Sequence, residues 1–286
     1  MLKILKVSKE VNPVSRENSW NQTYKSIDIK KINHRLLSDK IEGYTEYTNV
    51  IKNYFLNKDI KKKKIVELAC GTAPLAFYFR KKFKKNIICS DYSSIILDRL
   101  KKCDFEVQKS NISNLREFRD NSLDYIFLGG GFYEDQDPLF FKKVFSSLNK
   151  KLKDRGKIFI FMNRHLSFIN LKTYIQSLYF CKISPKSWKY VRKIFNKNEI
   201  NYEIALYLYS AKFIIKNLLK HNLISKKADY VGHALGLIEL FEIVLSKNLL
   251  HKFKNSKLLI KIAKYLQRKK INLFSTRVVL TIEKIN

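Results

Sequence analysis

Residues 64–78, KIVELACGTAPLAFY, constrain the fold of this chain more than any other stretch. Residues 65–68 are typical of a short buried strand, Gly71 and its small neighbours of a tight turn, and Pro74 of the first residue of a helix. Small side chains in such a turn let the backbone approach a ligand closely, and Glu67 adds a carboxylate at the end of the strand. The stretch therefore predicts a ligand-binding elbow between a strand and a helix.

A second strand is predicted over residues 86–91, and it ends at Asp91, twenty residues after Gly71. A carboxylate at the end of this strand can accept hydrogen bonds from both ribose hydroxyls of a nucleoside cofactor. The alternative role for Asp91 is that of an N-cap for the helix that Ser93 and Ser94 begin. The elbow and Asp91 together are more specific than either alone, and they favour a nucleoside ligand.

Strand and helix patterns alternate over residues 61–162. Beyond the two strands already described, we expect strands over residues 105–108, 125–128 and 157–162, and helices over residues 75–85, 93–100 and 137–152. This alternation predicts a parallel sheet with helices on both of its faces.

The string ELACGT at residues 67–72 resembles the first motif of the class I S-adenosylmethionine-dependent methyltransferases. Ala69 and Ala73 stand where that family usually has glycine. Alanine disfavours positive φ, so the turn must either stay at negative φ at these two positions or bear some strain. A nicotinamide dehydrogenase would use a similar elbow, but its Gly-x-Gly-x-x-Gly pattern is absent here.

The resemblance implies an α/β fold, a doubly wound, Rossmann-like, seven-stranded sheet whose last strand is antiparallel, with an inserted helical cap. The sixth and seventh strands are then expected over residues 224–231 and 274–284, after a helix over residues 212–220 that resembles the family's last helix. The expected parts are an N-terminal arm with helices over the cofactor (1–60), the cofactor-binding core (61–162), the inserted helical cap on the substrate side (163–204), and the rest of the core (205–286) with a helical insertion (234–270).

The resemblance also implies S-adenosylmethionine as the cofactor, a methyl transfer to a small-molecule or lipid acceptor, and a set of residues around the cofactor. Glu67 and Gly71 would border its methionine part, Asp91 would hold the ribose and Asn111 the adenine. The full set is Tyr24, Glu67, Ala69, Cys70, Gly71, Thr72, Asp91, Tyr92, Asn111, Ile112, Gly129 and Gly130.

Two members of this set leave alternatives open. Asn111 stands where the family commonly has Asp, and its side-chain carbonyl can still accept a hydrogen bond from adenine, whereas its amide could equally cap the loop. Tyr24 ends the segment SWNQTY, which resembles the Trp-x-x-x-Tyr segment that many small-molecule methyltransferases place over the cofactor. Alternatively, the two aromatic side chains pin an N-terminal arm to the core.

A hydroxyl acceptor would need a general base, and His165, His233 and Glu134 are the candidates. Both histidines follow predicted strands, and the alternative for each is a structural or surface role. Glu134 follows Gly129–Gly131, three glycines that leave room beside a ligand at the end of the predicted fourth strand. No Cys/His cluster has the spacing of metal ligands, so no metal is expected.

The formal net charge of +32 invites a nucleic-acid interpretation, because clustered basic side chains neutralise phosphates. The excess of Lys over Arg, with abundant Ile and Asn, is also what an A/T-rich genome produces, and no nucleic-acid-binding module is recognisable. We therefore favour a small-molecule or lipid methyltransferase. The alternatives are an RNA methyltransferase and a non-catalytic S-adenosylmethionine-binding protein, the second suggested by Ala69, Ala73 and Asn111.

Cysteine usage and the N-terminus fit a reduced, cytoplasmic protein, since the four cysteines show no paired spacing and the first residues carry no apolar run. Residues 249–270 form the basic amphipathic half of the expected helical insertion. Such a helix could cover the substrate pocket, form a dimer face or make peripheral contact with an anionic membrane. The sequence leaves the oligomeric state open.

Overall fold

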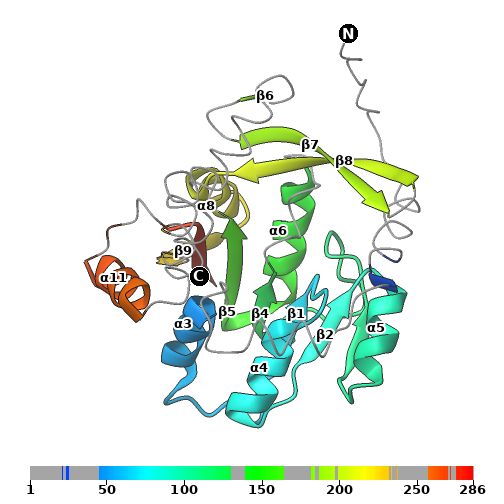
Figure 1. The fold of residues 1–286 in the computed structure, drawn as a ribbon. Helices are drawn as coiled ribbons and strands as arrows, with labels where there is room; N and C mark the ends of the chain where they lie inside the picture. The colour runs from blue at the N-terminus through cyan, green and yellow to red at the C-terminus, as the bar shows by residue number, and fades with distance from the viewer. Residues whose placement is uncertain are drawn as a thin grey trace.

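The computed structural model describes residues 21, 24–25, 45–129, 139–163, 182–183, 187–196, 199–231, 233, 237, 257–269, 271 and 275–285. Its main feature is a seven-stranded sheet with the strand order β3-β2-β1-β4-β5-β10-β9 (Figure 1). The strands are β1 (Ile65–Leu68), β2 (Ile88–Asp91), β3 (Val107–Lys109), β4 (Leu123–Leu128), β5 (Leu152–Asn163), β9 (Leu223–Val231) and β10 (Arg277–Lys284).

Strands β1 to β5 pair in parallel, and β10 lies antiparallel between β5 and β9. The predicted sheet with its antiparallel last strand is therefore confirmed. Every residue of the central strand β1 is buried, as expected for a parallel strand that is covered on both faces.

Helices cover both faces of the sheet, and each face has its own hydrophobic cluster. One cluster contains the buried sides of α6 (Phe140–Lys151) and α8 (Ala211–Leu219). The other contains those of α3 (Thr45–Phe55), α4 (Pro74–Phe83) and α5 (Ser94–Lys101). Because helices pack on both faces of the sheet, the fold is doubly wound.

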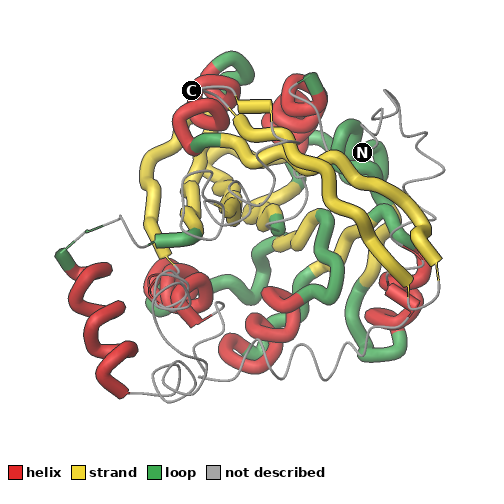
Figure 2. The backbone as a smooth tube through the Cα atoms, turned by 45° about the horizontal axis from the view of Figure 1, so that its top comes forward, coloured by secondary structure: helices red, strands yellow, loops and turns green. Residues whose placement is uncertain are grey.

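The prediction of a helical cap over residues 163–204 is wrong where the structure describes that segment. Its described residues belong to an antiparallel sheet of β6 (Lys182–Ile183), β7 (Ser187–Asn196) and β8 (Glu199–Tyr209). The sequence carried the signal, because apolar residues recur at every second position from Ile200 to Leu208, the period of a strand. Figures 1 and 2 show β7 and β8 crossing the end of the molecule toward which β5 points.

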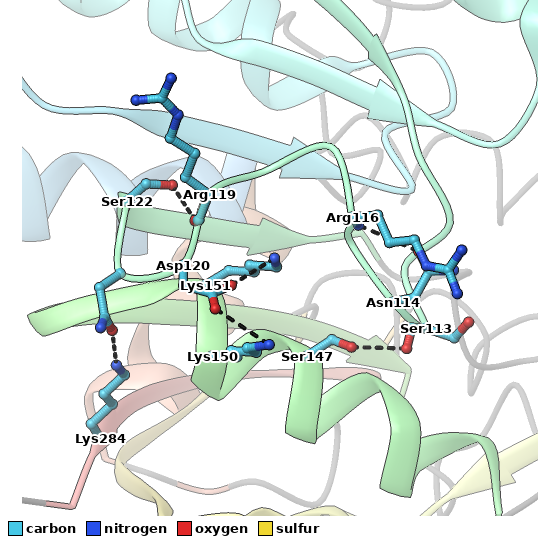
Figure 3. Close-up of polar contacts among 11 residues, drawn as sticks. Ser113, Asn114, Arg116, Arg119, Asp120, Ser122, Ser147, Lys150, Lys151 and Lys284 are labelled. Carbon is cyan, nitrogen blue, oxygen red and sulfur yellow. Dashed lines mark hydrogen bonds and ion pairs between the residues drawn. The ribbon is translucent and has the colours of Figure 1, made fainter.

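Polar contacts tie the segment between β3 and β4 to the elements beside it (Figure 3). Ser147 on α6 donates to the Ser113 carbonyl at 2.8 Å, and Lys151 forms a 2.8 Å ion pair with Asp120. At the start of β4, Asp124 accepts the Lys64 backbone N–H at 2.9 Å and pairs with Lys153 at 2.9 Å. Asp124 therefore joins β1, β4 and β5 at the edge opposite the predicted site, where its role is architectural.

Candidate active site

The turn after β1 bends through three residues in the left-handed region: Ala69 at φ 48°, Gly71 at φ 50° and Ala73 at φ 53°. Both alanines therefore bear the strain that glycine would avoid. The Cys70 N–H donates to the Ser90 carbonyl at 3.0 Å, and the Ala73 N–H donates to the Cys70 carbonyl at 2.8 Å. These bonds hold the turn against the end of β2.

Two glycines at this edge stand close to other parts of the chain. A Cβ on Gly71 would lie 3.0 Å from the Tyr24 hydroxyl oxygen, at a φ that already disfavours a side chain. A Cβ on Gly129, directly after β4, would lie 3.3 Å from the Ala69 carbonyl oxygen. The turns after β1 and β4 thus meet at the carboxyl edge of the sheet, and the Tyr24 side chain lies against the first of them.

Asp91 ends β2 and bridges the turns on either side of it. Its Oδ2 accepts the Gly71 N–H at 2.8 Å, and its Oδ1 accepts the Ser93 N–H at 2.9 Å. Burial raises the pKa of this carboxyl, and bonds from the backbone N–H groups of Ser93, Gly71 and Tyr92 oppose that rise. A carboxylate offers about four acceptor positions, so three N–H donors leave room for a further hydroxyl.

The N-cap of α5 is Ser93, whose Oγ accepts the Ile96 N–H at 3.5 Å, and not Asp91. The alternative role that the sequence left open for Asp91 is therefore taken by its neighbour. The Asp91 carboxylate instead fixes Gly71 at the turn, which is where a ligand would meet the end of β1.

Glu67 is fully buried, and both of its carboxyl oxygens face the first turn of α4. Oε2 accepts the Ala76 N–H at 2.8 Å and Oε1 accepts the Leu75 N–H at 3.4 Å. The N-cap residue Ala73 has no side-chain oxygen, so Glu67 supplies the capping acceptor from the strand. Burial raises the pKa of Glu67 to about 8, although the two N–H bonds lower it.

The N-terminal arm reaches this turn through contacts with α5. The Arg99 guanidinium donates to the Tyr24 carbonyl at 2.5 Å and to the Lys25 carbonyl at 2.6 Å, and Ser93 Oγ donates to the Asn21 side chain. The Tyr24 hydroxyl thereby lies over Gly71, where burial first, and then the nearby Asp91, raise its pKa. Sequence reasoning missed Arg99. Its partners Tyr24 and Lys25 precede it by 75 and 74 positions, and no local pattern links residues so far apart.

The comparison with protein families decides which kind of site this is. Residues 66–160, which carry the turn, Asp91 and Gly129, match the model of the methyltransferase domain family. These residues form a class I S-adenosylmethionine-dependent methyltransferase domain. S-adenosylmethionine is accordingly its cofactor, and the chain is an enzyme of methyl transfer.

Solved structures share the fold of the methyltransferase domain and of the segments around it. A Pyrococcus horikoshii OT3 protein aligns at a TM-score of 0.54 and 12% identity, over 92% of this chain and 98% of its own. An S-adenosylmethionine-dependent methyltransferase from Clostridium acetobutylicum ATCC 824 aligns at 0.51 and 16%, over 94% and 99%. The glycopeptide N-methyltransferase MtfA in complex with S-adenosylmethionine aligns at 0.52 and 9%, over 84% and 94%.

A comparison with curated protein sequences finds no match. Because the three solved structures are only 9% to 16% identical to this chain, their similarity establishes a common fold and no more.

The residues present in the methyltransferase domain fit the cofactor. Its ribose hydroxyls are donors, and Asp91 is a buried acceptor at the carboxyl end of β2. Its amino acid part would meet polar groups of the turn, because the Tyr24 hydroxyl lies beside Gly71 and the Ala69 carbonyl beside Gly129. The cradle contains no phosphate-binding glycine pattern, in keeping with a cofactor that carries no pyrophosphate.

Asn111 caps its own loop in the methyltransferase domain. Its Oδ1 accepts both the Ser113 N–H at 2.9 Å and the Ser113 hydroxyl at 2.8 Å, which is the alternative that the sequence offered for this side chain. The Ser110 N–H donates to the Asp91 carbonyl at 3.1 Å, so the loop begins beside the end of β2. An adenine contact through Asn111 Oδ1 would have to replace one of the Ser113 bonds.

The structure brings together most of the predicted cofactor set but fewer of the predicted catalytic residues. Tyr24, the turn of residues 69–72, Asp91, Tyr92 and Gly129 gather at the carboxyl edge of β1, β2 and β4, and Ile112 packs against the core below them. Cys70 is buried, and burial raises the pKa of its thiol, as expected of a structural cysteine. His233 is buried beyond β9, whereas His165, Glu134 and Gly130 lie outside the described residues.

Proposed function

We propose that this enzyme transfers the methyl group of S-adenosylmethionine to a small-molecule or lipid acceptor. The observation that carries the proposal is the joint geometry of Asp91 and Gly71 at the edge of a methyltransferase domain, under an N-terminal arm that brings Tyr24 over the turn. An arm held over the cofactor would restrict access to it, which suits an acceptor small enough to enter.

The roles of the individual residues follow from these contacts. We assign the ribose to Asp91 and the methionine part to Gly71, Thr72 and Gly129. Both oxygens of Glu67 accept N–H groups of α4, so Glu67 acts on the cofactor indirectly, by holding the turn. Asn111 borders the adenine through the loop that it caps.

The cofactor supplies an electrophilic methyl group on a sulfonium, and an acceptor atom attacks it in line. The chain's own contribution is mainly proximity and orientation, which hold the acceptor and exclude water. The buried Tyr24 hydroxyl and the turn around Gly71 would form one wall of a water-excluding space around the bound cofactor. A hydroxyl acceptor would need a general base, and His165, His233 and Glu134 remain the candidates for it.

The acceptor side is proposed to lie beneath the sheet formed by β6, β7 and β8. This sheet follows β5 in the chain and crosses above the carboxyl edge of the core (Figures 1 and 2). Ligands of open α/β sheets bind at that edge, so a cover placed there would contact the acceptor.

One observation favours a second candidate, an RNA methyltransferase. The formal net charge of +32 would attract a polyanion, and binding by phosphate contacts would weaken steeply with salt. A non-catalytic cofactor-binding protein is less well supported, because Ala69 and Ala73 adopt the left-handed backbone that glycine would take.

The experiment that separates these candidates is a labelling assay. The purified chain is incubated with methyl-labelled S-adenosylmethionine and a total cell extract, which is then divided into small-molecule, lipid and RNA fractions. We expect label in the small-molecule or lipid fraction, with none above background for an Asp91→Ala control. Label confined to RNA would replace the proposal with the RNA methyltransferase, and label in no fraction would contradict the proposed acceptor classes.

A further inference from the structure

Helix α11 (Lys257–Arg268) stands at the margin of the molecule, apart from the helices that cover the sheet (Figures 1 and 2). Leu259 and Leu266 are buried, which fixes the side of the helix that faces the rest of the protein. Leu258 and Tyr265 are 59% and 57% exposed, among the largest exposed fractions of apolar side chains in the described residues. Because they are seven residues apart, they lie two turns apart on one side of the helix.

Basic side chains flank this apolar pair. Lys261, Arg268 and Lys269 are exposed on α11 and just after it. Residues 243–282 contain no Asp or Glu at all, so the sequence around the helix offers no acidic side chain to neutralise them. The surface therefore combines exposed leucine and tyrosine side chains with basic side chains that have no acidic neighbour in the sequence.

We propose that α11 docks on the surface of an anionic phospholipid bilayer. Helices that lie in a membrane interface combine apolar side chains, which enter the boundary with the acyl chains, and basic side chains, which contact anionic headgroups. Leu258 and Tyr265 supply the first kind of contact, and Lys261, Arg268 and Lys269 the second. The contact is peripheral, since no helix within the described ranges is long and apolar enough to cross a membrane.

Other occupants suit this surface less well. A second copy of the chain packed on the same face would bring two basic helices together, and like charges repel. Leu258 and Tyr265 lie about 100° around the helix from the buried Leu259 and Leu266. More than half of each side chain is exposed, so neither is enclosed in the core. A nucleic acid would use the positive charge and could stack one base on Tyr265, but Leu258 offers no second aromatic plane.

The test is co-sedimentation of the full chain with vesicles of phosphatidylcholine alone and of phosphatidylcholine with phosphatidylglycerol. We expect binding to the anionic vesicles only, weakened by high salt because the charges lie at the surface. The double variant Leu258→Ser with Tyr265→Ser should bind anionic vesicles at least tenfold more weakly. Lys261→Gln with Arg268→Gln should weaken binding in the same sense.

The matched control is Leu56→Ser with Leu219→Ser, which removes two leucines that are 60% and 47% exposed elsewhere on the surface. This control should bind anionic vesicles as wild type does, and thermal unfolding of all variants verifies their folding. The proposal would be overturned if Leu258→Ser with Tyr265→Ser bound anionic vesicles as tightly as wild type. It would also be overturned if wild type did not bind them. Light scattering that shows a dimer lost in the α11 variant, without vesicle binding, would assign the surface to a second copy instead.

Discussion

At the scale of single residues, the left-handed alanines are the clearest departure from an unstrained turn. Ala69 has φ 48° and is only partly buried, so its Cβ contributes strain and little packing. We expect Ala69→Gly to raise the free energy of unfolding by about 0.5–1 kcal/mol, since relief of the strain outweighs the added freedom of the unfolded chain. Chemical denaturation measures this change.

The control for that substitution is Ala76→Gly, which places glycine inside the right-handed helix α4. It should lower the free energy of unfolding by about 1 kcal/mol, because glycine is a poor helix former and a buried methyl is lost. A loss of stability in Ala69→Gly as large as that in Ala76→Gly would show that the turn does not strain its alanine.

Glu67 should make stability depend on pH in a direction opposite to that of most carboxylates. Its folded pKa is raised to about 8 by burial, above its unfolded value, so the folded state holds a proton that the unfolded state has released. Stability from this group is therefore present at low pH and is lost as pH rises from about 4.5 to 8, at up to about 1.4 kcal/mol per pH unit. In Glu67→Gln this contribution disappears, and denaturation at pH 5 and pH 8 measures the difference.

Glutamine keeps one oxygen that can accept an α4 N–H, so the variant is expected to fold. Subtracting its pH profile from that of wild type isolates Glu67 from the other buried carboxyl, Asp91, whose pKa is also raised. Parallel profiles for wild type and Glu67→Gln would contradict this account of the buried carboxyl.

At the scale of elements, α5 holds the N-terminal arm over the site. Arg99 donates to two consecutive carbonyls of the arm, those of Tyr24 and Lys25. We expect Arg99→Gln to weaken S-adenosylmethionine binding by about three- to tenfold, because the arm loses bonds worth about 1 kcal/mol or somewhat more. Isothermal titration calorimetry measures the affinity.

Arg80 provides a closely matched control on α4. It also donates to two consecutive carbonyls, those of Cys103 at 2.6 Å and Asp104 at 2.7 Å, and it stacks on Phe105 away from the turn. Arg80→Gln should lower stability without a change in cofactor affinity. If both variants bind the cofactor equally well, Arg99 has a structural role only.

The alternation of strands and helices over residues 61–162 was predictable because each element there carries its own local signal. The period of buried residues, Pro74 at the start of α4 and Ser93 before α5 are all visible in the sequence. The β7–β8 hairpin was predictable in principle from the period of two in residues 200–208, but its aromatic residues were interpreted as a helical cap. Contacts between distant residues, such as Glu67 with α4 and Arg99 with Tyr24, have no local signature and appear only in the fold.

At the scale of the whole molecule, the cofactor site depends on elements that converge on one edge of the sheet. The turn after β1, the end of β2, the end of β4 and the N-terminal arm come from residues between 24 and 129. They contribute backbone, the Asp91 carboxylate and the Tyr24 hydroxyl to the same edge. Helix α11 and the basic side chains on it lie outside this arrangement. We therefore expect substitutions in α11 to leave cofactor affinity unchanged.

The most direct test of the account is calorimetric titration of wild type and Asp91→Ala with S-adenosylhomocysteine, the demethylated product. We predict that wild type binds in about the micromolar range and that Asp91→Ala binds about tenfold more weakly or worse, because a charged acceptor of a ribose hydroxyl is lost. Asp120→Asn, which changes an exposed carboxylate beside α6, serves as the control and should bind as wild type does. Equal affinity of wild type and Asp91→Ala, or no binding by wild type, would contradict the account.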